Sequence, residues 1–191
     1  SEVILALPGD TKAAHLETIE KLVNAGLNYV AIYSLMLLPG TEISSETTRR
    51  RFGMISKFRV LPRCFGTYKY DGEEVQSIEI EEVCVATDGL PFEDYVECRR
   101  FCLTVNIFYN DRVFAELIGL LNLCGVRAFD WLTAIHNSIA EFPLEIRDVY
   151  ERFTEETIGE LWGSEEELEE FAKRPENCRR YMSGEYGSNL V

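Results

Sequence analysis

Two strand endings of the same kind constrain the fold of this chain most strongly. The apolar run Val3–Leu7 stops at Pro8-Gly9, and the apolar run Leu35–Leu38 stops at Pro39-Gly40. A short, continuous apolar run that ends at a turn is typical of a strand covered on both faces, as in parallel sheets. The chain therefore contains two candidate buried strands that end in the same way.

The segment between these strands has the pattern of a helix. Asp10 or Thr11 caps its start, and Gly26 stands where helices commonly end. Its apolar face consists of Leu16, Ile19, Leu22 and Val23. Residues 28–38 return to a strand, so residues 2–38 form one βαβ unit with parallel strands. We expect a parallel barrel or sheet whose working loops follow the carboxyl ends of the strands.

The pattern changes twice further along the chain. Residues 41–57 are polar and basic, and short strand candidates with a turn at Asp71-Gly72 follow them. The strand candidates are residues 58–61, 66–70 and 76–86. From Pro91 onward apolar residues recur at helical spacing. The tail Ser183–Val191 is rich in small and polar residues, and we expect it to be loosely ordered.

The predicted fold class is α/β followed by mostly α, in three parts. Residues 1–57 are expected to be the last βα units of a partial (βα)6 barrel, which is truncated. Residues 58–90 are expected to be a strand-rich connector, and residues 91–191 a helical C-terminal extension. Two βα units do not close a barrel. A missing N-terminal part of the same polypeptide is therefore the first partner that we expect.

Composition excludes several classes of partner. The chain carries 33 acidic and 19 basic residues, a formal net charge of −14, which argues against nucleic acid or an anionic lipid surface as the main partner. No apolar run reaches the roughly 20 residues of a membrane span, and no signal peptide is recognisable. The six cysteines fall mostly on apolar faces rather than in a loop framework. They are expected to be reduced, which indicates a cytoplasmic protein.

One basic stretch interrupts this acidic chain. Thr47–Tyr70 contains seven basic residues and no acidic one, and it follows the second Pro-Gly ending directly. The candidate substrate-binding residues are Arg49, Arg50, Arg51, Arg59 and Arg63. Arginine is well suited to bind carboxylates and phosphates, so an anionic small-molecule substrate is one interpretation. A plain surface or a contact between domains is the other.

Three further groups of residues could in principle bind a metal or take part in catalysis, but we interpret each of them as structural. They are the histidines His15 and His136, the glutamates Glu79, Glu81 and Glu82, and the C-x3-C pair Cys98 and Cys102. The histidines have no evident catalytic partner, and strand alternation accounts for the glutamates as a solvated face. The cysteines share one helix face but lack a third ligand. We therefore predict no catalytic residue and no metal ligand in this chain.

The two Pro-Gly endings resemble segments of radical S-adenosylmethionine (radical SAM) enzymes. Ile4–Thr11 resembles the I-x-G-L-P-G-E-T segment on the fifth strand of that family, with Ala6 and Asp10 in place of Gly and Glu. Tyr33–Glu42 resembles the sixth strand, where an L-P-G-T-E ending is common in the group with an upstream cobalamin-binding domain. Looser similarity to that group extends over residues 58–110.

The resemblance implies S-adenosylmethionine and a [4Fe–4S] cluster in the full-length protein, with cobalamin bound by an upstream domain. In the family, a C-x3-C-x2-C loop holds the cluster, and no cysteine of this chain matches that loop. The cofactor-binding residues carried over are Ile4, Leu7, Pro8 and Gly9, which would lie against the adenine. The chain would be a fragment that contributes part of the adenine pocket and a cap over the substrate. Alone it should be inactive and should bind S-adenosylmethionine weakly or not at all.

Two alternatives stay open. The first is a non-catalytic α+β module that recognises a protein partner through its helices. The second is another βα-barrel enzyme that uses the basic stretch for an anionic substrate. The sequence does not define the substrate, the reaction outcome or the oligomeric state.

Overall fold

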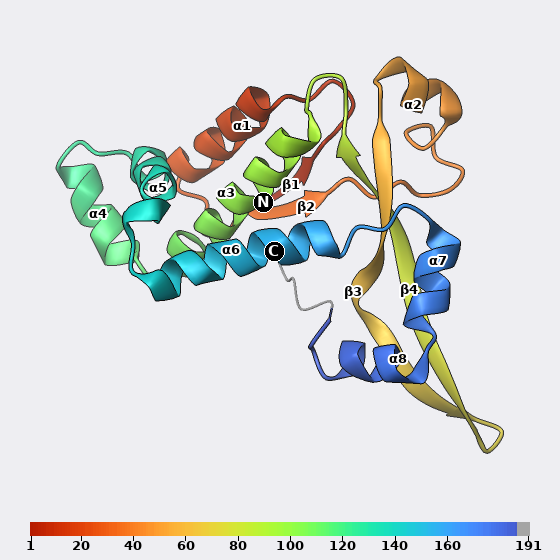
Figure 1. Cartoon of the computed structure of the whole chain (residues 1–191). Coiled ribbons are helices and arrows are strands. Elements are labelled where there is room, and N and C mark those ends of the chain that lie inside the picture. Colours follow the sequence, from red (N-terminus) through yellow and green to blue (C-terminus); the bar gives the residue numbers. More distant parts are fainter. Residues whose placement is uncertain (187–191) are drawn as a thin grey trace.

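The structure, a computed structural model, describes residues 1–186 (Figure 1). Its strands and helices, in chain order, are β1 (Glu2–Leu5), α1 (Lys12–Asn24), β2 (Ala31–Ser34), α2 (Glu46–Arg51), β3 (Ile55–Tyr70), β4 (Glu73–Ala86), α3 (Phe92–Phe108), α4 (Ala115–Leu123), α5 (Ala128–Asn137), α6 (Leu144–Gly159), α7 (Glu165–Ala172) and α8 (Pro175–Met182). Short 3₁₀ turns follow α3 and α5. Of the tail expected to be loosely ordered, residues 187–191 lie outside the described part.

The predicted βαβ unit is present at the start of the chain. β1 and β2 pair in parallel, with Ile4 opposite Tyr33. The side chain of Thr11 accepts a hydrogen bond from the Ala14 N–H and so caps α1. Ile19 on α1 is completely buried in the main core. The N-cap and the buried apolar face therefore both stabilise α1 in this unit.

The predicted partial barrel is wrong. Residues 1–186 contain two sheets of two strands each, β1-β2 and β3-β4, and no repeating βα units. After β2 the chain forms only the six-residue helix α2, which does not lead to a third parallel strand. Instead β3 and β4 pair with each other as an antiparallel hairpin. Their adjacency in sequence across a tight turn makes that pairing the simplest one to form.

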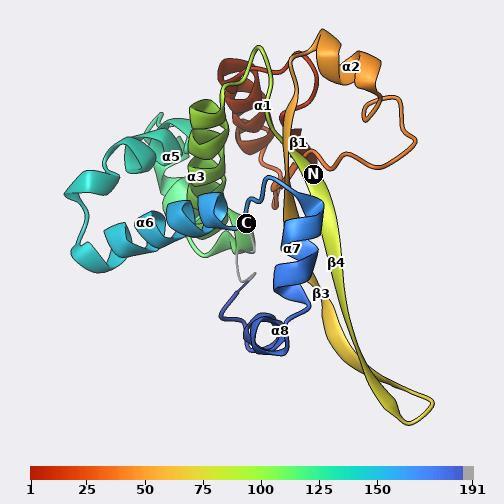
Figure 2. The same ribbon diagram turned by 45° about the vertical axis from the view of Figure 1, so that its right-hand side comes forward.

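The β3-β4 hairpin is long and projects from the rest of the molecule (Figures 1 and 2). Its turn residues Asp71 and Gly72 both have positive φ, as a type I′ hairpin turn requires. The strand register shifts between Val60 and Phe65, where Pro62 lacks the N–H that a regular ladder needs. Near its base, β4 also contacts the segment that follows β2, where the Leu37 N–H donates to the Glu82 carbonyl.

Helices cover both parts. α1, α3 and α5 pack with the buried face of the β1-β2 sheet, and the main core extends from Leu5 through Val83 of β4 to Leu132 of α5. α7 and α8 lie along the hairpin and form a second core with Val60 (Figure 2). Within residues 1–186, no single helix has both the length and the apolar composition needed to cross a bilayer. α4 and α5 meet these two criteria only when they are taken together, and the pair is bent by 111°.

Candidate functional site

A hollow of about 530 Å³ runs along β1, from Ser1 to the turn that follows the strand, with α1 on its other side. The residues that line it are Ser1, Glu2, Val3, Ile4, Leu7, Pro8, Gly9, Asp10, His15, Thr18 and Leu22. The four residues predicted to contact a cofactor, Ile4, Leu7, Pro8 and Gly9, are all among them. The structure therefore brings these four residues together at one concave surface.

The turn that forms one wall of the hollow follows from its residue types. The Asp10 N–H donates to the Leu7 carbonyl at 2.9 Å, which closes a four-residue turn with Pro8 and Gly9 at its centre. Gly9 has φ +82°, so the turn is of type II, which favours proline and then glycine at these positions. The turn leads directly into Thr11, the N-cap of α1.

Ala6, where the radical SAM segment that it resembles has glycine, does not line the hollow. Its side chain is fully buried in the main core, and its φ of +69° is a left-handed conformation that glycine adopts without strain. The methyl group therefore lies in the core and not in the hollow. The substitution affects backbone strain rather than access to the hollow.

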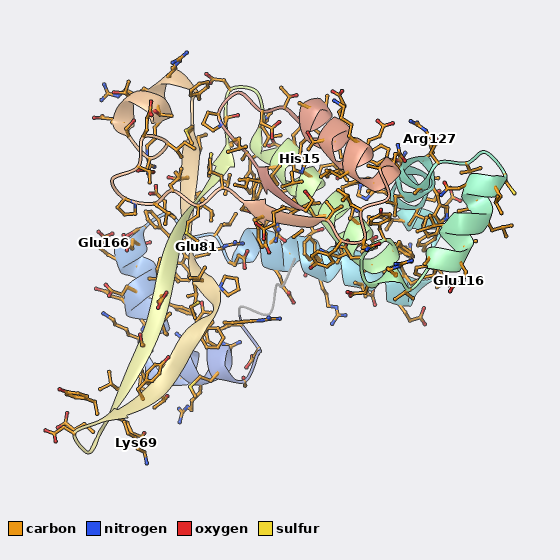
Figure 3. The ribbon with its side chains drawn as sticks, turned by 180° about the vertical axis from the view of Figure 1, so that it is seen from behind. His15, Lys69, Glu81, Glu116, Arg127 and Glu166 are labelled. Carbon is orange, nitrogen blue, oxygen red and sulfur yellow. The ribbon has the colours of Figure 1, made fainter. Side chains whose placement is uncertain are left out.

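His15 is the titratable side chain with the most unusual setting in this hollow (Figure 3). It is 2% exposed, its Nδ1 lies 3.8 Å from Asp10 Oδ2, and its Nε2 has no hydrogen-bond partner. Burial lowers the pKa of His15, and the charge of Asp10 offsets this only in part. The ring is therefore neutral at pH 7.

The face of the β1-β2 sheet next to the hollow is apolar and uncovered. Ile4 is 43% exposed and its register partner Tyr33 is 54% exposed. Partners in a parallel pair project to the same face. Leu7 extends this surface towards the turn. An apolar surface of this kind suits a flat aromatic ligand or another protein segment.

The predicted substrate arginines do not gather at this hollow, and most have partners. Arg49 on α2 forms a two-bond ion pair with Glu82, and Arg50 pairs with Glu46 one turn away. Arg59 is buried on β3, where it binds Glu81. The guanidinium of Arg51 lies 5.2 Å from the Phe52 ring, and Arg63 has φ +64° in the irregular part of β3. None of the five lines the hollow at β1.

The glutamates of β4 differ from their interpretation as one solvated face. Glu79 is exposed, but Glu81 is 6% exposed and accepts a 2.6 Å hydrogen bond from Arg59 Nε. Glu82 accepts hydrogen bonds from Arg49 and Ser56 on the opposite face. Successive side chains of a strand point to opposite faces of the sheet, but this alternation does not show which face is covered by another helix or strand. The Arg49 hydrogen bond lowers the pKa of Glu82, so this carboxylate stays ionised.

The thiols do not fit the iron–sulfur cluster that the resemblance implies. Residues 1–186 contain no group of three or more His, Cys, Asp or Glu side chains that could hold a metal ion. Cys98 and Cys102 are buried, and burial raises the pKa of each to about 12. Both thiols are therefore protonated at pH 7, whereas cluster ligands are thiolates.

The sequence did not indicate a network of hydrogen bonds around His136. His136 Nε2 lies 2.9 Å from Glu97 Oε1, and Nδ1 lies 2.9 Å from Thr104 Oγ1, which also contacts the Tyr150 hydroxyl. The hydrogen bond with His136 lowers the pKa of Glu97 to about 2. Thr104 is completely buried, so it is inaccessible as a nucleophile, and these hydrogen bonds join α3, α5 and α6 as a structural network. Glu97 and His136 lie on different helices, so no sequence spacing indicates the pair.

Comparison of the sequence with models of known protein families and with curated proteins finds no match.

Proposed function

We propose that this chain is part of a radical SAM enzyme and that the hollow at the end of β1 receives the adenosyl group of S-adenosylmethionine. The observation that supports the proposal is the convergence of Ile4, Leu7, Pro8 and Gly9 on one concave surface. Those residues are the ones that the resemblance places against the adenine. Convergence did not follow from the resemblance alone, because Ile4 lies within β1 and the others lie in the turn beyond it.

The chemistry of the hollow suits a purine. Its volume of about 530 Å³ falls within the range of small-molecule sites. Ile4 and Leu7 offer an apolar wall, and Gly9 has no side chain, so the backbone comes close to a flat ring. A neutral histidine avoids placing a second cation beside the sulfonium group.

The other cofactors of the proposed enzyme would be held outside the described residues. A bound [4Fe–4S] cluster would supply the electron that cleaves S-adenosylmethionine. Because the buried thiols here do not fit the cluster, the cluster and a cobalamin domain would be held by other parts of the proposed enzyme. The role of this chain is then to bind and orient the adenosyl group. We also predict that the helices of this chain form a cap over the substrate.

Nuclear magnetic resonance of the isotopically labelled chain tests this function directly. Titration with S-adenosylmethionine is expected to shift the amide signals of Leu7, Gly9 and His15, with a Kd on the order of 1 mM because only part of the pocket is present. 5′-Deoxyadenosine should shift the same signals, and methionine should not.

A matched pair of variants separates the site from a general effect. Leu7→Glu places a charge in the hollow and should abolish the shifts. Leu38→Glu changes the residue before the second Pro-Gly, which is also exposed but does not line the hollow, and should leave the shifts intact. Shifts confined to signals far from Gly9, or equal shifts with methionine, would disprove the proposed function.

A further inference from the structure

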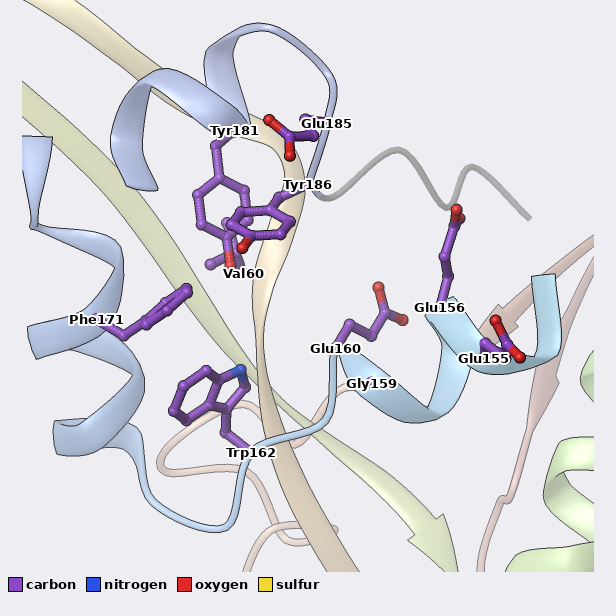
Figure 4. Close-up of a pocket in the computed structure, with 10 residues that line it drawn as sticks. All are labelled: Val60, Glu155, Glu156, Gly159, Glu160, Trp162, Phe171, Tyr181, Glu185 and Tyr186. Carbon is purple, nitrogen blue, oxygen red and sulfur yellow. The ribbon is translucent and has the colours of Figure 1, made fainter. Parts of the chain in front are cut away.

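A second hollow, of about 420 Å³, lies between the hairpin, the end of α6, and helices α7 and α8 (Figure 4). It lies far along the chain from the β1 turn and shares no lining residue with that hollow. Its lining residues are Val60, Glu155, Glu156, Gly159, Glu160, Trp162, Phe171, Tyr181, Glu185 and Tyr186. The lining is unusual because it combines four aromatic rings with four carboxylates and contains no basic residue.

The four rings form a continuous arc along one side. Phe171 lies 4.9 Å from Trp162 and 6.0 Å from Tyr186, and Tyr186 lies 5.4 Å from Tyr181, measured between ring centroids. Trp162, Phe171 and Tyr186 are only partly buried, so they keep surface open to the hollow. Aromatic faces carry a negative quadrupole that attracts cations.

Glu155, Glu156 and Glu160 lie across the hollow from Trp162 and Phe171, whereas Glu185 lies beside Tyr181 and Tyr186 (Figure 4). Glu160 is bound by Arg59, and Glu185 pairs with Arg180 at 2.6 Å. Glu155 and Glu156 are exposed, and neither forms an ion pair within residues 1–186. Two negative charges at the rim therefore remain without a counter-ion from the described chain.

One ring of the arc already binds a cation within the protein. The guanidinium carbon of Arg180 lies 3.8 Å from the centroid of the Tyr186 ring. This contact demonstrates that the aromatic arc accommodates positive charge. A metal ion would not suit the hollow, because hard cations require several oxygen ligands at short distance rather than ring faces.

We propose that this hollow binds an alkylated ammonium group of the trimethylammonium type. Methyl groups on nitrogen spread the charge, reduce the desolvation penalty and contact ring faces, so such cations are recognised by aromatic cages. The ligand is either a small molecule that resembles choline or a methylated lysine side chain, since both present the same group. The inference stands on the second hollow alone and does not depend on the proposed function.

The first experiment compares choline with 3,3-dimethyl-1-butanol, its uncharged isostere. The full chain carries Trp131→Phe, so that Trp162 is the remaining tryptophan and reports binding by fluorescence. Choline should change the fluorescence with a Kd on the order of 1 mM or lower, and the isostere should bind at least about tenfold more weakly. Equal binding of the two would reduce the site to an apolar pocket and overturn the proposal, as would no binding of choline.

Variants then test the arc and the carboxylates separately. Phe171→Leu keeps an apolar side chain but removes the central ring, and it should weaken choline binding about tenfold. Glu156→Gln should weaken binding severalfold, whereas Glu151→Gln, also exposed on α6 but not part of the lining, should have no effect. Circular dichroism checks that each variant is folded. Unchanged affinity in both Phe171→Leu and Glu156→Gln would refute the assignment.

A final comparison distinguishes the sources of the ligand. A peptide with one trimethyllysine and the same peptide with unmodified lysine are titrated against the chain. Tighter binding of the methylated peptide than of choline would identify a methylated protein as the ligand. Equal or weaker binding would identify a small molecule, and preference for unmodified lysine would contradict the role of the methyl groups.

Discussion

Removal of Arg59 should destabilise the chain more than removal of any exposed arginine. Arg59 Nε lies 2.6 Å from Glu81 Oε1, and Nη1 lies 2.8 Å from Glu160 Oε1, so one guanidinium joins β3, β4 and the end of α6. The three side chains are 10%, 5% and 14% exposed. Burial lowers the pKa of Arg59, but the charges of Glu160 and Glu81 outweigh this, so Arg59 is always charged. Burial raises the pKa of Glu160, against the effect of Arg59.

The variant Arg59→Met preserves the alkyl stem but removes the hydrogen-bonded counter-ion of two buried carboxylates, although the charge of Arg99 still acts on Glu160. Breaking a buried ion pair by removing one partner costs about 3–5 kcal/mol, and we expect the free energy of unfolding at pH 7 to fall by about that amount. Without Arg59 the folded-state pKa of Glu160 rises further above its ordinary value. The loss should therefore be larger above pH about 4.5, where Glu160 is ionised in the unfolded chain, and smaller at lower pH.

Urea denaturation at pH 7 and pH 4, followed by tryptophan fluorescence, measures both effects. Arg50→Met is the matched control, because its pair with Glu46 is exposed and should be worth less than about 0.5 kcal/mol. The triple change Arg59→Met, Glu81→Gln, Glu160→Gln should recover much of the stability, since it removes the buried charges together. The reasoning is refuted if Arg59→Met costs no more than Arg50→Met.

Two more predictions concern other parts of the fold. The hydrogen bond from His136 holds the pKa of Glu97 at about 2, below its ordinary 4.5. The stability that ionised Glu97 contributes is therefore present above pH 4.5 and is lost as the pH falls towards 2. Over that range the unfolding temperature of the native chain should fall more steeply than the unfolding temperature of Glu97→Gln. A Cβ on Gly89 would lie 2.6 Å from the Asp10 carbonyl oxygen, so Gly89→Ala should lower the free energy of unfolding by about 1–3 kcal/mol. A Cβ on Gly119 of exposed α4 would have nothing within 4 Å, so Gly119→Ala should raise the free energy of unfolding by about 0.5–1 kcal/mol. Calorimetry that shifts the stability of Gly89→Ala and Gly119→Ala in the same direction would contradict this prediction.

Local patterns predicted the first unit of the fold well. The apolar run before Pro8, the cap at Thr11 and the end near Gly26 are determined by neighbours in sequence, and β1 and α1 follow them closely. β2 is shorter than predicted, because only Ala31–Ser34 of residues 28–38 pair with β1. The turn at Asp71-Gly72 was predictable for the same reason, since these residue types adopt positive φ. Spacing also brought the candidate cofactor residues to one hollow.

Contacts between distant segments were beyond the sequence. The barrel was predicted from two similar strand endings, but similar endings do not supply further parallel strands, and the next strands pair with each other. Alternation placed Glu81 on one face of β4, yet only the packing of Arg59 and Glu160 decided that this face is buried. The aromatic arc likewise joins residues from a loop, two helices and the segment after α8. Such residues share no period or motif that a pattern could detect.

Photocrosslinking tests the central claim most directly, namely that the turn after β1 binds the adenosyl group. S-Adenosylmethionine with an azido group on the adenine is irradiated with the chain, and tryptic peptides are analysed by mass spectrometry. The label should be in Ser1–Lys12, which contains Pro8 and Gly9, or in Ala13–Lys21, which contains His15, and excess S-adenosylhomocysteine should prevent it. A label confined to other peptides, or no label that the competitor removes, would contradict the account.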